Sequence, residues 1–368
     1  MTIMKSLGID ARMWRHSGIG VYLRNLLPRV VNKLPEVWFV IMGDAGALAL
    51  GGQLDRENVS LVNFSSPIYG LREQWELRRR LPRCLDGFWS PHYNFPLFFG
   101  GKRLVTVHDM CHLALKQFVP GFHRRYYARR MLTQVAKQAD AIICVSTFTK
   151  EEFNKYVKVP HQRIYTVHNG VDEFFLASAT AMQSPPVHYP YILYVGNVKP
   201  HKNLPTLLQA FVSLMGEIPH NLVVVGKKEG FIAEDQKVLN FAAGYGGRIV
   251  FTGEIDQETL KQYYLHAAML VFPSLYEGFG LPPLEAMACG CPVIASQAAS
   301  LPEVCGQSAI YFNPFAPAEL ACKIKELLND ERRRQLLQGA GRKRAGQFSW
   351  DKSAARTVDV IKELLDIT

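Results

Sequence analysis

The chain has 368 residues, of which 48% are hydrophobic and 20% are charged, and this balance excludes a disordered or fibrous protein. Its length predicts two domains, because a single hydrophobic core rarely grows to that size. Residues 1–175 carry 24 Lys and Arg against 14 Asp and Glu, whereas residues 176–368 carry 18 against 18, so the whole net charge of +10 lies in the first half. This asymmetry suggests that the two halves have different partners.

Several classes of protein are disfavoured by what the sequence lacks. No apolar run is long enough to cross a bilayer, and the first residues lack the apolar core and cleavage site of a signal peptide, so we expect a cytoplasmic protein. The seven cysteines are scattered without a CxxC pair, which indicates reduced thiols. No cluster of metal ligands stands out, and we expect neither a metal ion nor a cofactor.

Strands and helices alternate along the first half, which predicts a parallel sheet covered on both faces. Ser146 or Thr147 is expected to cap the last of its helices. The predicted strands cover 6–11, 37–44, 59–64, 86–92, 103–109, 141–146 and 163–171, and the predicted helices cover 18–34, 69–84, 122–139 and 148–157.

The same alternation returns in the second half after a stretch rich in Ala, Ser and Pro. Its predicted strands cover 191–198, 221–227, 248–255, 268–274, 292–296 and 309–314, and its predicted helices cover 204–218, 256–267, 281–289 and 316–330. A long amphipathic helix is predicted at the C-terminal end of the sequence.

The fold class is therefore α/β, with two doubly wound, Rossmann-like domains. We expect an N-terminal domain at 1–175, a linker at 176–190, a second domain at 191–349, and a terminal helix at 350–368 that crosses back to the first domain. Ligands of such sheets bind beyond the carboxyl ends of the strands, and a cleft between two such domains is a natural site.

The segment EGFGLPPLEAMACGCPVIAS, residues 277–296, places two glutamates eight positions apart around a constrained turn. The two prolines suit the first turn of a helix that ends at Gly290, so Glu285 is expected in that first turn, where the helix dipole favours its charge. Glu277 is expected in the preceding loop. Glycines beside a helix N-terminus suit an anion or sugar hydroxyls, and carboxylates accept hydrogen bonds from vicinal diols. Two glutamates alone are equally compatible with an ordinary capped helix.

Three other stretches carry candidate residues. In YVGNVKPHKNLPTLLQAF, Lys202 precedes a helix and is placed to meet a diphosphate, although a single lysine is more often solvated. Gly18 and Gly20 open the first helix after the first strand, where glycines let backbone approach phosphate. His108 ends the strand RLVTVHD and is a candidate for donating to a sugar hydroxyl or for proton transfer, against the simpler interpretation of a packed histidine.

Together these motifs resemble the family 4 glycosyltransferases, which are retaining enzymes of the GT-B fold. The resemblance rests on E-x7-E at 277–285, GNVKPHKN at 196–203, VHNGVD at 167–172, SGIGVYLRNL at 17–26 and VHD at 107–109, and it covers essentially the whole chain. It implies transfer of a sugar from a nucleoside diphosphate sugar without a metal, with GDP-mannose as the best guess for the donor. It also implies an acceptor that is a glycan or a lipid-linked sugar, as in the assembly of lipopolysaccharide and other cell-surface polysaccharides.

The resemblance further implies roles for individual residues. His108, Lys202 and Glu277 would be catalytic, with His108 and Glu277 on the transferred sugar and Lys202 on the diphosphate. Glu285 would hold the ribose diol. The remaining donor contacts would come from Gly18, Gly20, Asn197, Ile255 near the base, Gly278, Phe279, Gly280 and Leu281. Many members of the family have an arginine where this chain has Asn197, so a second positive charge on the diphosphate is missing or comes from elsewhere, such as Lys199 or His201.

The basic first half is expected to face the acceptor. Arginines and tyrosines interleave in the predicted helix at 122–139, a pattern that suits an anionic bilayer surface or a lipid phosphate, and a solvated basic face with inward tyrosines is an equal alternative. We therefore expect a peripheral protein of the inner membrane face and no nucleic-acid partner. The residues assigned to this acceptor or membrane surface are Arg124, Arg125, Tyr126, Tyr127, Arg129 and Arg130.

Other functions remain open at this stage. The alternatives are a UDP-sugar-dependent glucosyl- or N-acetylglucosaminyltransferase, a sugar-nucleotide epimerase that needs no acceptor, and a non-catalytic nucleotide-binding subunit on the same fold. A Rossmann dehydrogenase is disfavoured, because no GxGxxG follows the first strand.

Overall fold

The structure is a computed structural model that describes residues 4–68, 70–82, 84–115, 122–157, 163–177, 184–227, 241 and 244–367. The chain divides into two compact units. The first comprises Met1–Gly170 with Ser349–Thr368, and the second comprises Val171–Phe348. Of the predicted linker at 176–190, residues 178–183 lie outside the described residues, as do positions 69 and 83 of the helix predicted at 69–84.

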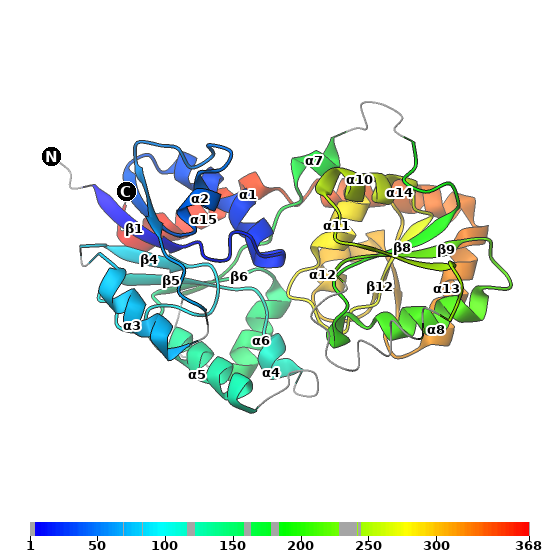
Figure 1. The fold of residues 1–368 in the computed structure, drawn as a ribbon, viewed down its shortest axis with the longest axis horizontal. Coiled ribbons are helices and arrows are strands. Elements are labelled where there is room, and N and C mark those ends of the chain that lie inside the picture. The colour runs from blue at the N-terminus through cyan, green and yellow to red at the C-terminus, as the bar shows by residue number, and fades with distance from the viewer. Residues whose placement is uncertain are drawn as a thin grey trace. The chain divides into compact units, whose positions relative to one another are not determined.

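The first unit is built on a parallel sheet of seven strands in the order β3-β2-β1-β4-β5-β6-β7 (Figure 1). The strands are β1 (Lys5–Asp10), β2 (Val37–Gly43), β3 (Val59–Asn63), β4 (Gly87–Ser90), β5 (Lys102–Val107), β6 (Ala141–Cys144) and β7 (Arg163–Thr166). The chain moves outward from β1 to β3 and then returns to β4 beside β1, so the strand order reverses between β1 and β4. The carboxyl ends of these two strands are where ligands of such sheets bind.

Helices cover both faces of this sheet (Figure 1). One face carries α1 (Gly18–Lys33), α2 (Ala45–Ala49) and α15 (Trp350–Leu365), and the other carries α3 (Leu71–Arg80), α5 (Phe122–Gln138) and α6 (Thr147–Val157), with the short α4 (Cys111–Ala114) after β5. The face under α3 is packed by apolar side chains of the strands and of the helix, among them Met42, Leu77 and Phe88. This burial stabilises the packing of α3 on the sheet, although most residues of the helix are charged.

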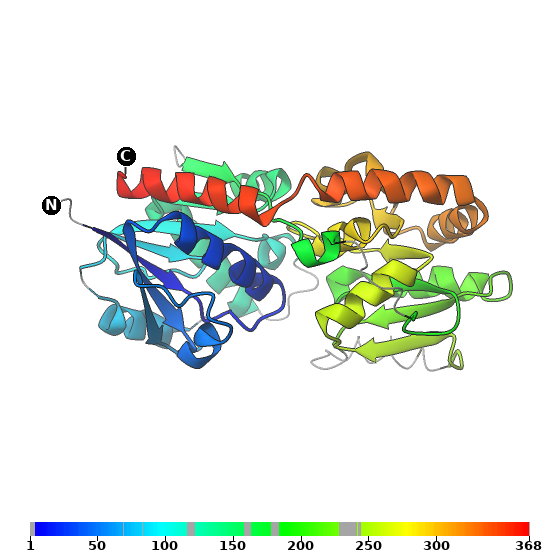
Figure 2. The same cartoon turned by 90° about the horizontal axis from the view of Figure 1, so that it is seen from above.

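The C-terminal helix α15 belongs to the first unit and runs along α1 (Figures 1 and 2). The Trp350 ring packs edge-on against Tyr22 of α1, with ring centroids 6.0 Å apart. Arg29 Nε donates to Asp351 Oδ1 over 3.2 Å. The buried residues of α15 recur with helical spacing, as the amphipathic pattern of its sequence requires.

The second unit is built on a parallel sheet of six strands in the order β10-β9-β8-β11-β12-β13 (Figure 1). The strands are β8 (Tyr191–Val195), β9 (Asn221–Val225), β10 (Ile249–Gly253), β11 (Met269–Phe272), β12 (Val293–Ser296) and β13 (Ile310–Phe312). Here the order reverses between β8 and β11, so their carboxyl ends are the counterpart of the β1–β4 position.

Two layers of helix cover this second sheet (Figure 1). α8 and α13 pack together on one face, over a core that includes Leu207, Phe211 and Ile324. α10, α11 and α14 lie on the other face, where α14 packs along α11. The bounds are α7 (Glu173–Leu176), η1 (Pro200–Lys202), α8 (Leu204–Leu214), α10 (Gln257–His266), α11 (Leu281–Ala288), α12 (Leu301–Cys305), η2 (Gly306–Ser308), α13 (Pro317–Asn329) and α14 (Glu331–Ala345).

All thirteen described strands coincide with segments expected from the sequence, and the expected α/β class is confirmed. Ser146 caps α6 as expected, since its Oγ accepts a hydrogen bond from Thr149 N over 3.0 Å. α3 is shorter than the helix predicted at 69–84, because the chain becomes extended at Leu81, before Pro82. The long helix α14 was not predicted. Within the described part of the chain, no helix is long and apolar enough to cross a membrane.

The substitution Gly170→Ala tests how closely the start of α15 packs against the rest of the first unit. A Cβ added at Gly170 would lie 2.1 Å from Trp350 N, so Gly170→Ala must displace the start of α15. We expect a loss of about 1–3 kcal/mol in the free energy of unfolding, measured as a lower urea midpoint. Gly216→Ala is the control, because nothing lies within 4 Å of its added Cβ. Equal midpoints for the two variants would contradict this packing.

Candidate functional site

The centre of the candidate site in the second unit is an ion pair between two loops. Lys202 ends η1, which follows β8, and Glu277 lies in the loop that leaves the neighbouring strand β11. Lys202 Nζ lies 2.6 Å from Glu277 Oε1, and the two side chains are 20% and 13% exposed. The structure therefore brings together the two residues singled out from separate motifs, at the point where the strand order reverses.

Hydrogen bonds of Asn203 hold Lys202 in place. Asn203 adopts a left-handed conformation with φ of 55°, which turns the chain from η1 into α8. Its side-chain amide donates to Pro273 O over 3.1 Å and to Pro314 O over 2.8 Å. Leu275 N donates to His201 O over 2.8 Å. The Lys202 turn is thus tied to the loop after β11, which carries Glu277.

A buried serine, Ser300, holds the backbone of the loop that carries Glu277 by hydrogen bonds. Ser300 Oγ lies 3.0 Å from Glu277 O and 2.8 Å from Phe279 O, and it can donate to either carbonyl. Gly280, with φ of 104°, precedes α11, which begins at Leu281. The Phe279 ring is buried and packs edge-on against Phe348, with ring centroids 5.7 Å apart. Gly278, which was also assigned to the donor contacts, lies between Glu277 and Phe279 in this loop.

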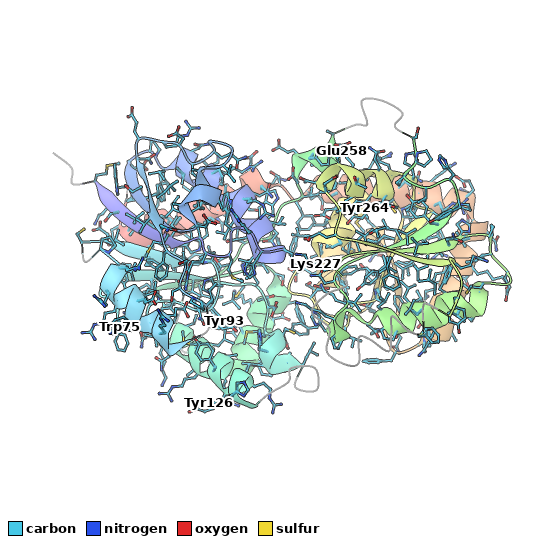
Figure 3. All side chains as sticks on the ribbon, viewed as in Figure 1. Trp75, Tyr93, Tyr126, Lys227, Glu258 and Tyr264 are labelled. Carbon is cyan, nitrogen blue, oxygen red and sulfur yellow. The ribbon has the colours of Figure 1, made fainter. Side chains whose placement is uncertain are left out.

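Glu285 lies in a different environment from the one expected. Because α11 begins at Leu281, Glu285 is one turn into the helix, and its placement in the first turn was wrong. Burial raises the pKa of Glu285 to about 7, with the charge of Asp172 adding to the rise, although Tyr264 Oη donates to Glu285 Oε2 over 3.0 Å. Tyr264 extends from α10 (Figure 3). Burial therefore sets the pKa of this carboxyl near neutral pH.

The remaining donor-site candidates of the second unit lie at neighbouring strand ends. Asn197 follows β8, and its Oδ1 accepts a hydrogen bond from Lys227 N over 3.1 Å. Ile255 is half-buried and follows the end of β10. Both residues stand beyond the carboxyl edge of the same sheet as Lys202 and Glu277.

In the first unit, His108 is half-buried just after β5. Its Nε2 donates to Pro91 O over 2.8 Å, and its ring lies edge-on to Tyr22 with centroids 4.8 Å apart. Burial lowers the pKa of His108 to about 4, so the ring is neutral at pH 7. With Nε2 bonded to Pro91, the remaining Nδ1 is an acceptor. Nδ1 would therefore accept a hydrogen bond from a sugar hydroxyl, whereas the sequence suggested that His108 donates one.

The two glycines at the start of α1 differ in their surroundings. Gly18 begins α1 with φ of 29°, and no atom lies within 4 Å of an added Cβ. An added Cβ at Gly20 would lie 2.7 Å from Trp14 O and 2.9 Å from Met13 O. Close packing against the preceding loop accounts for this second glycine.

A buried polar network at the ends of β1 and β4 was missed from the sequence. Arg12 donates to Asp10 through Nε over 2.9 Å, and its Nη2 lies 2.5 Å from both Asp10 Oδ2 and Glu73 Oε1. His92 Nε2 lies 3.0 Å from Asp10 Oδ2, and Asn94 Nδ2 donates to Glu73 Oε2 over 2.7 Å. Although burial opposes it, Arg12 and His92 hold the pKa of Asp10 well below its usual range. Glu73 lies 61 residues from Arg12 and His92 lies 82 residues from Asp10, and partners so far apart in the sequence give no local signal.

The basic surface assigned to the acceptor or to a membrane is only partly exposed. Tyr126, Arg129 and Arg130 are exposed on α5, and Arg125 is half-buried. Tyr127 is also half-buried, and its Oη accepts a hydrogen bond from Asn94 Nδ2 over 3.0 Å. The side chain of Arg124 lies outside the described residues.

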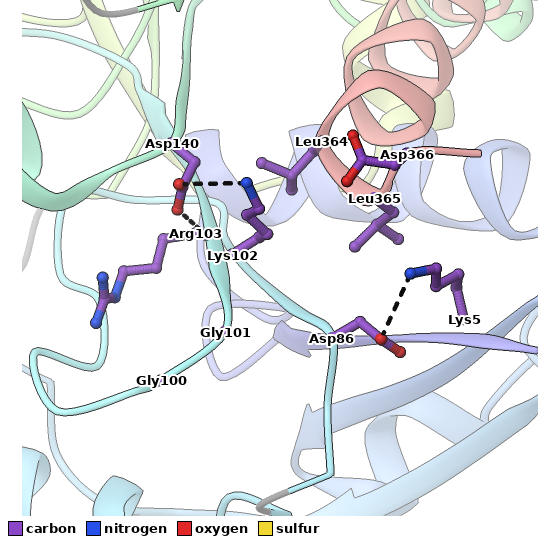
Figure 4. A pocket seen from close by; sticks show the side chains of 10 residues that line it. All are labelled: Lys5, Asp86, Gly100, Gly101, Lys102, Arg103, Asp140, Leu364, Leu365 and Asp366. Atoms are coloured by element: carbon purple, nitrogen blue, oxygen red, sulfur yellow. Dashed lines mark hydrogen bonds and ion pairs between the residues drawn. The ribbon is translucent and has the colours of Figure 1, made fainter. Parts of the chain in front are cut away.

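A separate pocket of the first unit lies at the opposite, amino edge of its sheet (Figure 4). Charged side chains of both signs face each other across it, with Lys5 Nζ 3.8 Å from Asp86 Oδ1 and Lys102 Nζ 4.0 Å from Asp140 Oδ1. Leu364 and Leu365 of α15 also line this pocket. Its place away from the carboxyl ends of the strands separates this pocket from the candidate site. Among the described residues, no group of three or more His, Cys, Asp or Glu is arranged to hold a metal ion.

Comparison with known proteins identifies the family. Residues 16–173 match the family described as Glycosyltransferase Family 4, and residues 181–344 match Glycosyl transferases group 1. O-antigen chain mannosyltransferase B of Escherichia coli is 30% identical over 320 residues, which cover 84% of this chain and 82% of that protein. This chain is a glycosyltransferase, with a family 4 domain followed by a group 1 domain.

Solved structures confirm the fold of the glycosyltransferase. Sucrose-phosphate synthase of Thermosynechococcus elongatus superposes with a TM-score of 0.80 at 20% identity, covering 99% of this chain and all of that one. HepE of Anabaena, solved in complex with UDP and glucose, superposes with a TM-score of 0.77 at 16% identity, covering 98% of this chain and all of that one. The expected GT-B fold of two Rossmann-like domains is thereby confirmed.

The raised pKa of Glu285 predicts a dependence of stability on pH. The folded glycosyltransferase binds this proton more tightly than the unfolded chain, so stability falls as pH rises from the ordinary value of 4.5 to about 7 and then levels off. Glu285→Gln should lack this fall, which we expect to be on the order of 2 kcal/mol in urea unfolding.

Glu319→Gln is the control for the pH series, because a hydrogen bond from Asn313 N lowers the pKa of Glu319 and moves its titration below this window. It should keep the pH dependence of the wild type. An identical fall in the wild type and in Glu285→Gln would contradict the assignment.

Proposed function

We propose that the protein transfers mannose from GDP-mannose to a lipid-linked or polysaccharide acceptor, with retention of the anomeric configuration and without a metal ion or other cofactor. The observation that carries this proposal is the Lys202–Glu277 pair at the carboxyl ends of β8 and β11. The similarity to O-antigen chain mannosyltransferase B supports mannose as the sugar, and the complex of HepE with UDP and glucose supports a nucleotide-sugar donor.

In the proposed reaction, the bond between the sugar C1 and the diphosphate oxygen breaks, and negative charge builds on the diphosphate. The ammonium of Lys202 stabilises that charge, together with backbone amides at the start of α11. Glu277, released from Lys202, accepts hydrogen bonds from the sugar hydroxyls, and Glu285 accepts them from the ribose diol.

Retention follows if the acceptor hydroxyl attacks C1 from the side that the diphosphate leaves. The new bond joins C1 to the acceptor oxygen, and the acceptor proton passes to a phosphate oxygen of the leaving group. No covalent bond to the enzyme is required in this scheme.

Lys202→Ala and Glu277→Gln test this function. Each should lower kcat for mannose transfer by about 10²–10³, because each removes a group that acts on developing charge or on the reacting sugar. Transfer is measured from GDP-mannose to a lipid-linked acceptor, with and without EDTA, and the EDTA should have no effect. Lys325→Ala, which breaks an exposed ion pair with Glu217, is the control and should keep wild-type activity.

The same assay separates the competing functions. UDP-glucose and UDP-N-acetylglucosamine are offered as alternative donors, and selective transfer from either would replace the mannosyl assignment. Conversion of the donor sugar without an acceptor would indicate an epimerase. Donor binding without turnover would indicate a non-catalytic subunit. Near-normal turnover in Lys202→Ala or Glu277→Gln would contradict the proposed mechanism.

We also propose that the protein is cytoplasmic and docks peripherally on the anionic inner face of a membrane through α3 and α5. Trp75, Phe98 and Tyr126 are 58%, 67% and 55% exposed. The guanidinium of Arg79 lies 4.6 Å from the ring centroid of Trp75, and that of Arg78 lies 5.7 Å from Phe98. Trp75 and Tyr126 project from the two helices (Figure 3). Exposed aromatic rings beside arginines suit the boundary between acyl chains and anionic head groups.

Sedimentation with lipid vesicles tests this docking. The wild type should bind vesicles that contain phosphatidylglycerol and should not bind phosphatidylcholine alone. Trp75→Ala combined with Arg79→Ala should weaken binding roughly tenfold, because it removes one anchor and one charge worth about 1 kcal/mol. Arg332→Ala combined with Arg333→Ala, on the exposed face of α14, is the control and should bind as the wild type does. Equal binding to both lipids would contradict an electrostatic dock.

A further inference from the structure

Three neighbouring strands of the second unit each lead into a glycine at the carboxyl edge of the sheet. Gly196 follows β8, Gly226 follows β9, and Gly253 ends β10, with φ values of 154°, 151° and 79°. A Cβ added at Gly226 would lie 2.2 Å from Gly196 O, so only glycine fits there. Gly196 N donates to Val225 O over 2.9 Å, and Gly226 N donates to Gly253 O over 3.0 Å. The edge is therefore bare backbone, which a ligand can approach closely.

The first side chains beyond these glycines are Asn197, Lys227 and Glu254. Asn197 Oδ1 accepts the hydrogen bond from Lys227 N over 3.1 Å. This bond ties Lys227 to the turn after β8 that leads to Lys202, whose side chain also stands at this edge. Lys227 is marked in Figure 3. Asn197 carries no charge, and Lys227 brings a positive charge to this turn from the neighbouring loop.

Lys227 makes a weak ion pair. Its Nζ lies 2.9 Å from Glu254 Oε2, and the two side chains are 53% and 64% exposed. Exposed pairs of this kind contribute roughly 0–1 kcal/mol, so an incoming anion of higher charge displaces the carboxylate at little cost. The edge thus holds two lysine–glutamate pairs, Lys202–Glu277 and Lys227–Glu254, whose charges sum to zero.

We infer that Lys227 is a second cation for the diphosphate of the donor, and that Glu254 is the counterion that the diphosphate displaces. This inference rests on the proposed function and adds a residue to it. A diphosphate carries two or more negative charges, and one ammonium leaves part of that charge uncompensated. Exchange of both pairs at once places two ammonium groups on the diphosphate and frees Glu277 for the sugar.

Calorimetry with GDP and with guanosine tests the inference. Lys227→Ala should weaken GDP binding by roughly tenfold, the size of one charge-assisted contact, and should leave guanosine binding unchanged, because guanosine has no phosphate. Glu254→Gln should bind GDP as tightly as the wild type or more tightly, because it removes the competing carboxylate. Lys325→Ala is the matched control: it breaks an exposed lysine–glutamate pair with Glu217, just before β9, and should bind GDP normally. Thermal melting confirms that each variant is folded.

Two results would overturn the inference while leaving the proposed function in place. Unchanged GDP binding in folded Lys227→Ala would show that Lys227 does not reach the diphosphate. Weaker binding of both GDP and guanosine in Glu254→Gln would show that this carboxylate contacts the base, with Lys227 as its counterion. If the wild type binds neither GDP nor UDP, the proposed function itself fails, and the inference fails with it. If it selects UDP, then UDP and uridine replace GDP and guanosine in the same test.

Discussion

The part-buried ion pair between Lys202 and Glu277 is the interaction on which the candidate site depends. It joins the loops after β8 and β11, the two strands between which the order of the second sheet reverses. Each loop has its own support, from Asn203 on one side and from Ser300 on the other. A lysine and a carboxylate held this way are neutral as a pair. They become a cation for phosphate and an acceptor for hydroxyls when a ligand separates them.

The two glutamates of the E-x7-E motif have different electrostatic environments, which suits two different tasks. Glu277 faces the ammonium of Lys202 at 2.6 Å. Glu285 is half-buried and bonded to Tyr264, and its pKa is raised to about 7, so this carboxyl suits a neutral ligand such as a diol. The sequence shows two acids of the same type, and only the packing around them separates their chemistry.

The sequence was sufficient to predict the alternating elements, because buried parallel strands leave continuous apolar runs between amphipathic helices. The helix α14 was not predicted, because its sequence is rich in charged residues and its apolar face is narrow. Gly341 and Ala345 are its buried positions. The bond between Tyr127 and Asn94 and the network of Asp10, Arg12 and His92 could not be predicted for another reason. Their partners lie on other elements, up to 82 residues away, and no local pattern records such contacts.

Candidate site residues were predictable by type and motif, but their bonding was not. The pairing of Lys202 with Glu277 and the bond from His108 to Pro91 both depend on how loops meet at a sheet edge.

The most direct test of the central claim is a crystal structure of the protein with bound GDP-mannose. The account predicts Lys202 Nζ within about 3 Å of a phosphate oxygen and Glu277 hydrogen-bonded to the sugar instead of to Lys202. An intact Lys202–Glu277 pair, with the diphosphate bound away from the ends of β8 and β11, would contradict it.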